Sequence, residues 1–156
     1  MSAPVTIRIQ SADFDIAAEI ASLTKDNTGI GAVVSFSGIC RGWEGDKAIT
    51  AMTLEHYPGM AEAEISRHVS EATSRWPLDG VTVIHRYGRV VPGDNIVLVL
   101  TASMHREAAF QAAEFLMDYL KTNAPFWKSE ERAGGSTTQW VDARSDDDSA
   151  TARWKK

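Results

Sequence analysis

The sequence predicts an α+β protein with a mainly antiparallel sheet and three helices. Segments with strand and helix patterns follow one another in the order strand, helix, two strands, helix, several strands, helix and strand. A doubly wound parallel sheet would instead alternate strand and helix strictly. The 156 residues suit one domain, because two domains in this length would each have too little core. We expect one domain over residues 1–144, followed by a polar, flexible tail over residues 145–156.

The first third of the chain predicts three strands and one helix. Residues 5–9 predict a short strand, and apolar residues at helical spacing predict a helix over residues 13–25. Residues 32–39 are rich in Val, Phe and Ile and predict a second strand. The polar, Gly-containing segment RGWEGD at residues 41–46 predicts a mobile loop, and the alternating residues 50–56 predict a third strand.

Two longer helices are bounded by prolines. Pro58 is expected in the first turn of one of them, where its missing N–H has no cost, and Pro77 ends it. This helix has an apolar stripe made of Ala61, Ile65, Val69, Ala72 and Trp76. The other helix covers about residues 106–122, and Pro125 prevents its continuation.

The remaining strands lie before and after the last helix. Three segments between the two long helices have strand patterns, namely residues 81–85, 87–91 and 96–102. After the last helix, residues 129–138 are polar and Gly-containing and predict a loop. Residues 139–143 predict a final strand.

Composition and charge argue against several classes of protein. With 16 Lys and Arg against 21 Asp and Glu, the formal net charge is −5, which argues against broad nucleic-acid binding. The longest purely apolar run, residues 96–100, is far shorter than the ~20 residues of a membrane helix. Residues 1–8 show no export signal. The single cysteine, Cys40, excludes an internal disulfide, and we expect a reducing, cytoplasmic location.

Cationic residues stand at the ends of predicted elements, although the sequence has no P-loop, HExxH or GxSxG motif. They are Arg41, His105, Arg106, Lys121, Lys128 and Arg144. Each has an ordinary explanation, because the macrodipole favours a lysine in a last helical turn and loop charges are usually solvated. Arg106 is less ordinary, because the dipole disfavours a cation in a first turn, and a bound anion would offset that cost.

One spacing favours a chemical role for Lys121. Met117 lies four residues before Lys121 and shares its helix face, and Phe110 and Ala113 lie near that face. Apolar surroundings disfavour the charged form of a lysine, which can then act as a base or as a nucleophile. Lys128 is the natural second cation. Together the two lysines predict a cleft that attracts a phosphate or a carboxylate.

Seven short motifs occur in order between about residues 30 and 144. They are LEHYPGM at 54–60, RWPL at 75–78, VIHR at 83–86, PGD at 92–94, HR at 105–106, MDYLKT at 117–122 and APFWK at 124–128. Each motif alone is weak, whereas the combination is specific. Together they resemble the large, catalytic subunit of molybdopterin synthase, an enzyme of molybdenum cofactor biosynthesis.

The resemblance implies an α/β hammerhead-type fold with added antiparallel strands, and no metal or cofactor of the subunit's own. Such subunits form homodimers, and each binds a small ubiquitin-like sulfur-carrier subunit, which gives a heterotetramer. The carrier's C-terminal Gly-Gly ends in a thiocarboxylate that enters a pocket of the large subunit. Sulfur then moves to cyclic pyranopterin monophosphate, and two such transfers form the dithiolene of molybdopterin.

The resemblance also implies roles for individual residues. Lys121 resembles the central catalytic lysine, and Lys128 resembles its partner. His105 and Arg106 resemble ligands of the substrate anion on the dimer-facing side of the pocket. Arg41 and Arg144 resemble residues that contact the phosphate or the pterin. Phe36 and Met117 resemble residues of the apolar pocket wall. Cys40 is not expected to carry sulfur, because the carrier supplies it.

Two other functions stay open on the sequence alone. A noncatalytic adaptor for a ubiquitin-like Gly-Gly tail would need the groove, but would not need Lys121 and Lys128 together. A binder of single-stranded nucleic acid would stack bases on Phe126 and Trp127. The net charge of −5 and the lack of a contiguous basic stripe count against the second alternative.

Overall fold

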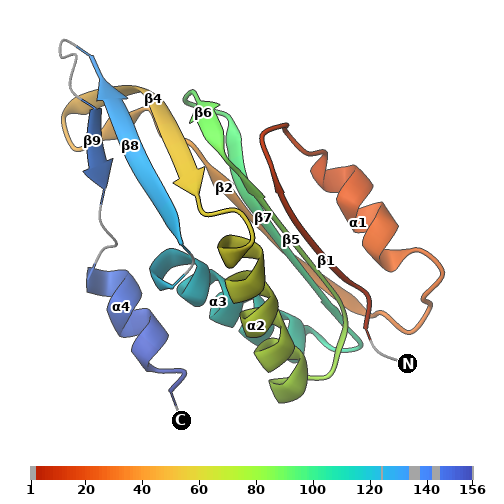
Figure 1. The fold of residues 1–156 in the computed structure, drawn as a ribbon. Helices are drawn as coiled ribbons and strands as arrows, with labels where there is room; N and C mark the ends of the chain where they lie inside the picture. The colour runs from red at the N-terminus through yellow and green to blue at the C-terminus, as the bar shows by residue number, and fades with distance from the viewer. Residues whose placement is uncertain (1–2, 124, 134–137, 142–144, 156) are drawn as a thin grey trace.

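The computed structural model describes residues 3–123, 125–133, 138–141 and 145–155 (Figure 1). Its helices are α1 (Ile16–Thr24), α2 (Met60–Arg75), α3 (Arg106–Thr122) and α4 (Ser145–Ala152). The strands of the first sheet are β1 (Val5–Gln10), β2 (Ala32–Ile39), β5 (Leu78–Arg86) and β7 (Asn95–Ser103). The other strands are β3 (Trp43–Glu44), β4 (Lys47–His56), β6 (Gly88–Val90), β8 (Phe126–Arg132) and β9 (Thr138–Val141).

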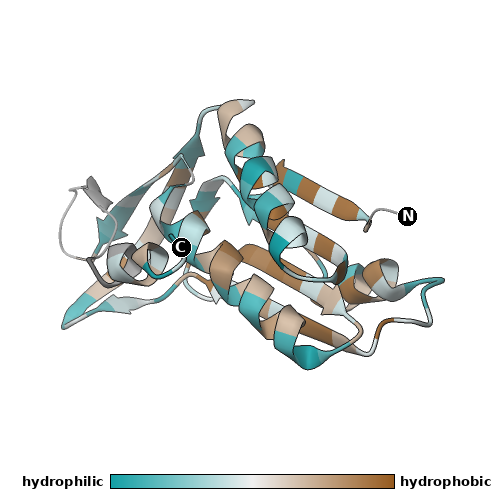
Figure 2. Cartoon of the chain, turned by 90° about the horizontal axis from the view of Figure 1, so that it is seen from below, coloured by the Kyte–Doolittle hydropathy of each residue, from teal (hydrophilic) through white to brown (hydrophobic). Residues whose placement is uncertain are grey.

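The first sheet has the strand order β1-β5-β7-β2 and is buried on both faces at its centre. Only the β1–β5 pair is parallel, and the β5–β7 and β7–β2 pairs are antiparallel. Because successive side chains of a strand point to opposite faces, Val83 packs on one side of the sheet and Ile84 on the other. Figure 2 shows these central strands in the brown of apolar residues, between helices whose outer faces are teal.

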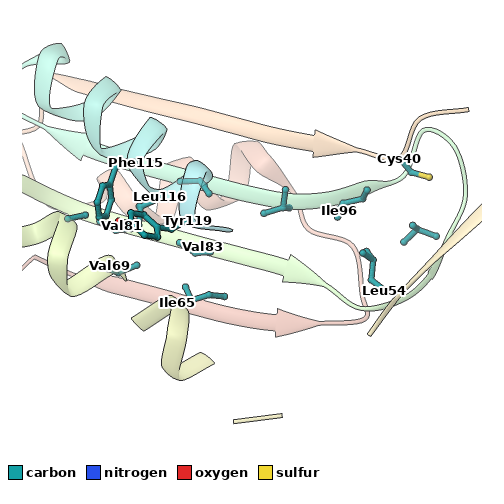
Figure 3. Packing of buried hydrophobic residues seen from close by; sticks show 14 of the residues in the cluster. Cys40, Leu54, Ile65, Val69, Val81, Val83, Ile96, Phe115, Leu116 and Tyr119 are labelled. Atoms are coloured by element: carbon teal, nitrogen blue, oxygen red, sulfur yellow. The ribbon is translucent and has the colours of Figure 1, made fainter. Parts of the chain in front are cut away.

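Helices α2 and α3 cover one face of the first sheet, and α1 covers the other. Figure 3 shows the larger core, in which α3 places Phe115 and Tyr119 against Val83 of β5. The same cluster extends past Ile96 to Cys40, at the end of the sheet where β2 stops and β7 begins. This end of the first sheet faces the second sheet.

The second sheet has the strand order β3-β4-β8-β9, and β6 pairs with β4 as well. Strand β8 runs antiparallel to β4, with Lys128 opposite Leu54 and Phe126 opposite His56. Because β8 follows α3 after a short connection, the end of α3 and the start of β8 lie together (Figure 1).

The predicted α+β class and the three predicted helices are confirmed, with three local corrections. Residues 129–132 were predicted as loop but belong to β8, because pairing with β4 and β9 outweighs the low strand propensity of Lys, Ser and Glu. Helix α2 begins at Met60 rather than at Pro58, because Gly59 has a φ of 85° and its N–H donates to Glu62. The expected loop over residues 41–46 contains β3, which pairs with β4.

The segment predicted as a polar tail contains helix α4, and the residues after it are packed against the rest of the molecule. The indole of Trp154 lies among Trp76 and Phe115, with ring centroids 5.7 and 5.6 Å away. Its Nε1 donates to Asp118 of α3 at 2.6 Å, and Arg153 donates to the same carboxylate at 2.9 Å. The end of the chain is therefore attached to α3 one turn before Lys121.

Among the described residues, no helix is long and apolar enough to cross a membrane.

Candidate active site

Two predicted site residues, Lys121 and Lys128, lie at the same end of the molecule. Lys121 is exposed in the last turn of α3, and Met117, one turn earlier, packs against the core. Lys128 is half-buried near the start of β8. Both ammonium groups act electrostatically on one buried side chain, His85 of β5. The two lysines therefore lie close enough to His85 for both of their charges to lower its pKa.

His85 is buried near the end of β5, in the first sheet. It shares a face of β5 with Val81 and Val83, and stands opposite Val97 of β7. Burial, with smaller contributions from the positive charges of Lys128 and Lys121, lowers the pKa of His85 to about 4, although the hydrogen bond to the Arg86 carbonyl opposes this shift. His85 is therefore neutral at pH 7.

The backbone sets which nitrogen of His85 holds the proton. Nδ1 lies 2.8 Å from the carbonyl oxygen of Arg86, and since a carbonyl only accepts, Nδ1 must be the donor. In the neutral ring, Nε2 then keeps its lone pair and is a hydrogen-bond acceptor.

An aromatic stack holds the start of β8 over His85. The ring of Phe126 lies on the imidazole with centroids 3.7 Å apart and an interplanar angle of 12°. His56 at the end of β4 stacks on the same ring at 6.0 Å, and Tyr87 contacts His56 at 4.8 Å. Phe126 and Lys128 are two residues apart on one strand, so their side chains share a face. The stack therefore positions Lys128.

The predicted apolar wall lies on the same face of the first sheet. Phe36 of β2 is opposite Val99, and its neighbour on that face, Gly38, is opposite Val97. Phe36 is 38% exposed, which leaves its ring accessible at the sheet edge. A Cβ on Gly38 would stand 2.5 Å from Cγ1 of Val97, so a side chain does not fit there.

Arg41 and Cys40 stand where β2 ends. The guanidinium of Arg41 is exposed and forms an ion pair with Glu44 at 2.7 Å. Cys40 is 2% exposed, and burial, with Asp94 and Glu130 nearby, raises the pKa of its thiol. A protonated thiol is a poor nucleophile. Arg144, also predicted as a ligand, lies outside the described residues.

His105 and Arg106 lie at the opposite end of α3 from Lys121. His105 is the N-cap residue without a side-chain capping bond, and Arg106 is the first helical residue. Both line an open hollow with Gly31, Ala32, Met104 and Glu107. The 15 residues from Arg106 to Lys121 span roughly 22 Å of helix, so within one chain the structure does not bring these residues to the lysines.

Sequence reasoning did not connect three side chains, namely His85, Phe126 and Glu130, with the site of the two lysines. His85 interrupts the apolar alternation that Val81 and Val83 begin, which is the signal that marks it. Phe126 gives no such signal, because its stacking partners come from distant strands. Glu130 is 4% exposed, and its Oε2 has no hydrogen-bond partner among the described residues. Its burial depends on β8, which was predicted as loop at this position.

The fold and the site together define an α+β protein in which two lysines act on a buried histidine where two sheets meet. The family model described as MoaE protein matches residues 9–123, and the chain belongs to this family. It is 62% identical over 150 residues to the molybdopterin synthase catalytic subunit of Mesorhizobium japonicum, covering 96% of this chain and 93% of that protein.

Two solved structures have the same fold. The molybdopterin biosynthesis MoaE protein of Burkholderia ambifaria has a TM-score of 0.82 at 50% identity, covering 97% of this chain and 99% of that one. The complex of subunits 1 and 2 of the molybdopterin-converting factor from Helicobacter pylori has a TM-score of 0.70 at 20% identity. That comparison covers 90% of this chain and 92% of the matched chain, and it bears on the fold alone.

Proposed function

We propose that this chain is the catalytic subunit of a molybdopterin synthase in which Lys121 and Lys128 act on the transferred sulfur. A small ubiquitin-like carrier presents its C-terminal thiocarboxylate, and the acceptor is cyclic pyranopterin monophosphate. The observation that supports this proposal is that Lys121 and Lys128 stand at the adjoining ends of α3 and β8, where both charges lower the pKa of His85. An adaptor that only holds a Gly-Gly tail has no need of two cations at one point.

The charges of the site fit two anionic reactants. A thiocarboxylate and a phosphate repel each other, and the ammonium groups of Lys121 and Lys128 offset that repulsion where they meet. Lys121 acts as general acid or base, stabilises a developing oxyanion, or captures the carrier's acyl end. Cys40 takes no part, because its pKa is raised by burial and it stays a thiol. The sulfur therefore comes from the carrier.

A second copy of the chain completes the site with His105 and Arg106. Strand β2 is an edge strand, and its first residue, Ala32, is opposite Ser103, two residues before His105. Its last residue, Ile39, is opposite Asn95, at the end of the sheet that contains His85. A twofold axis through the middle of β2 places the start of one copy beside the end of the other.

The lengths of the two elements agree with this arrangement. The eight residues of β2 span roughly 26 Å, close to the roughly 22 Å that separate Arg106 from Lys121 along α3. In such a dimer, each site combines the lysines of one chain with His105 and Arg106 of the other. Arg41 and Phe36, both on the β2 side, then contact the substrate between them.

The carrier docks through its extended tail. A Gly-Gly tail offers backbone groups and no side chains, so it binds beside a strand and in a narrow groove. A small partner subunit agrees with the two-subunit complex described for the Helicobacter pylori protein. We place the reaction in the cytoplasm, where a single free cysteine stays reduced.

Reconstitution with purified components tests this function. The protein is mixed with thiocarboxylated carrier and cyclic pyranopterin monophosphate, and the dithiolene product is measured. Wild type should form the product, and Lys121→Ala should form none while it still binds the carrier. Lys25→Ala, an exposed lysine after α1, is the matched control and should keep full activity. Carrier binding without product from wild type would favour the adaptor, and full activity of Lys121→Ala would remove that lysine from the mechanism.

A further inference from the structure

His85 has an acceptor nitrogen that no described residue uses. Its Nδ1 donates to the Arg86 carbonyl, which leaves the lone pair on Nε2. No described residue donates to Nε2, and Nε2 is not among the unpaired polar atoms that are sealed from solvent. An unpaired atom that is not sealed reaches solvent, so this acceptor is available to a donor at the surface.

The surroundings of His85 on β5 are apolar and would favour an apolar residue at this position. Val81 and Val83 precede it on the same face of β5, within the core under α2 and α3. Burying an imidazole costs more than burying a third aliphatic side chain. Its stacking on Phe126 does not require nitrogen, since a phenyl ring stacks equally well. What the imidazole adds at this place is the acceptor Nε2.

Lys121 is the donor that suits this acceptor. No hydrogen bond or ion pair is found for its ammonium group among the described residues. Lys121 stands in the last turn of α3, just before β8 and the Phe126 ring that stacks on His85, and its positive charge lowers the pKa of His85. A lysine has a long, flexible stem, and ordering it for catalysis costs conformational entropy. A fixed acceptor at the base of the site reduces the number of positions that the ammonium group visits.

We propose that His85 is a positioning residue of the synthase, and that its Nε2 accepts a hydrogen bond from the Lys121 ammonium and fixes it beside Lys128. This inference rests on the proposed role of Lys121. The stack with Phe126 holds the imidazole plane, and the Arg86 carbonyl holds its tautomer. The acceptor is therefore preorganised before substrate arrives, and only the lysine side chain has to move.

Three variants distinguish a role of Nε2 as hydrogen-bond acceptor from a role of the His85 ring in packing. His85→Gln places an amide near the Nε2 position and keeps an acceptor, His85→Asn keeps a donor near Nδ1 alone, and His85→Phe keeps only the stacked ring. We expect kcat for dithiolene formation to stay within about threefold in the Gln variant and to fall about tenfold or more in the other two. The KM for the thiocarboxylated carrier should change little in all three. Circular dichroism and thermal unfolding confirm that each variant is folded.

A purely structural role would reverse this order. His85→Phe, which preserves packing, would then be the most active variant and His85→Gln the least active, and that order would overturn the proposal. If His85→Asn fails to fold, the Gln and Phe variants alone decide between the two orders.

The Lys121→Ala variant also separates this inference from the proposed function. If Lys121→Ala keeps full activity, the proposed function fails and the inference fails with it. If Lys121→Ala is inactive while His85→Phe has the wild-type kcat, only the positioning role is wrong.

Discussion

The ring of Phe126 lies almost flat on the imidazole of His85, with their centroids 3.7 Å apart. This contact joins the start of β8 to the end of β5, and so joins the second sheet to the first. Phe126 lies five residues after Lys121 and two residues before Lys128. The chemistry that we assign to the lysines therefore depends on the packing of two rings between sheets.

Acid should destabilise the fold through His85. Its folded pKa, about 4, lies below the ordinary value of 6.5, so the unfolded chain binds more protons as the pH falls below about 6.5. The free energy of unfolding should therefore decrease with falling pH, and His85 should account for about 2 kcal/mol between pH 7.5 and 5.

Urea unfolding at both pH values and one protein concentration measures this effect. His85→Phe lacks the titrating group but keeps Lys121, Lys128 and His56, which act on it. Its stability should therefore fall less than that of wild type over this range, by about the amount assigned to His85. Equal pH dependence in both proteins would show that His85 is not held neutral by the fold.

Gly38 should not tolerate a side chain. In Gly38→Ala, the new Cβ would meet Cγ1 of Val97 at 2.5 Å, and the stiff valine has little freedom to move away. We expect a loss of about 1–3 kcal/mol in the free energy of unfolding. Gly42→Ala is the control, because its Cβ would meet Pro92 only at the ordinary distance of 3.5 Å. Equal stability of the two variants would contradict the close packing between β2 and β7.

Trp154 should stabilise the protein although it lies near the end of the chain. Trp154→Ala removes ring contacts with Trp76 and Phe115 and the hydrogen bond to Asp118. We expect a loss of about 2 kcal/mol, measured as a lower midpoint in chemical denaturation. Trp43, which is 62% exposed on β3, is the matched control, and its replacement by Ala should have little effect. An unchanged midpoint for Trp154→Ala would mean that the tail does not contribute to stability.

Dimerisation should depend on the edge strand β2. Ile39 is 53% exposed there, and Ile39→Lys places a charge in the proposed contact between copies. We expect the dimer dissociation constant, measured by sedimentation at micromolar concentration, to rise roughly 30-fold or more. Val5→Lys is the control, since Val5 is 46% exposed on β1 at the other edge of the same sheet. A larger effect at Val5 than at Ile39 would place the interface on β1 and would contradict a dimer formed through β2.

The sequence was most informative where side-chain period and turn residues act locally. The apolar stripe of α2, the buried run of β7 and the glycine- and proline-rich turns predicted those elements within a few residues. Strand β8 was not predicted beyond Lys128, because its Ser and Glu residues become strand through pairing with β4 and β9. Helix α4 was not predicted either, and the packing of Trp154, which follows α4, is evident only from its contacts with α3.

The site was predictable only in part for a related reason. Lys121 and Met117 share a helix face, which spacing alone predicts, and the motif resemblance adds Lys128. The separation of Arg106 from Lys121 follows from their positions at opposite ends of one helix, but the use of a second copy to rejoin them depends on the place of β2 in the sheet. His85 was visible as an interruption of the apolar pattern, whereas its stacking on Phe126 required the structure.

Complementation between two inactive variants tests the shared site most directly. Lys121→Ala and Arg106→Ala are each expected to abolish dithiolene formation, and the two proteins are mixed in equal amounts and allowed to exchange subunits. Half of the dimers are then mixed, and each mixed dimer has one intact site, so about a quarter of the wild-type activity should return. If each chain builds its whole site alone, every site keeps a defect and the mixture stays inactive. An inactive mixture would contradict a site shared between two chains.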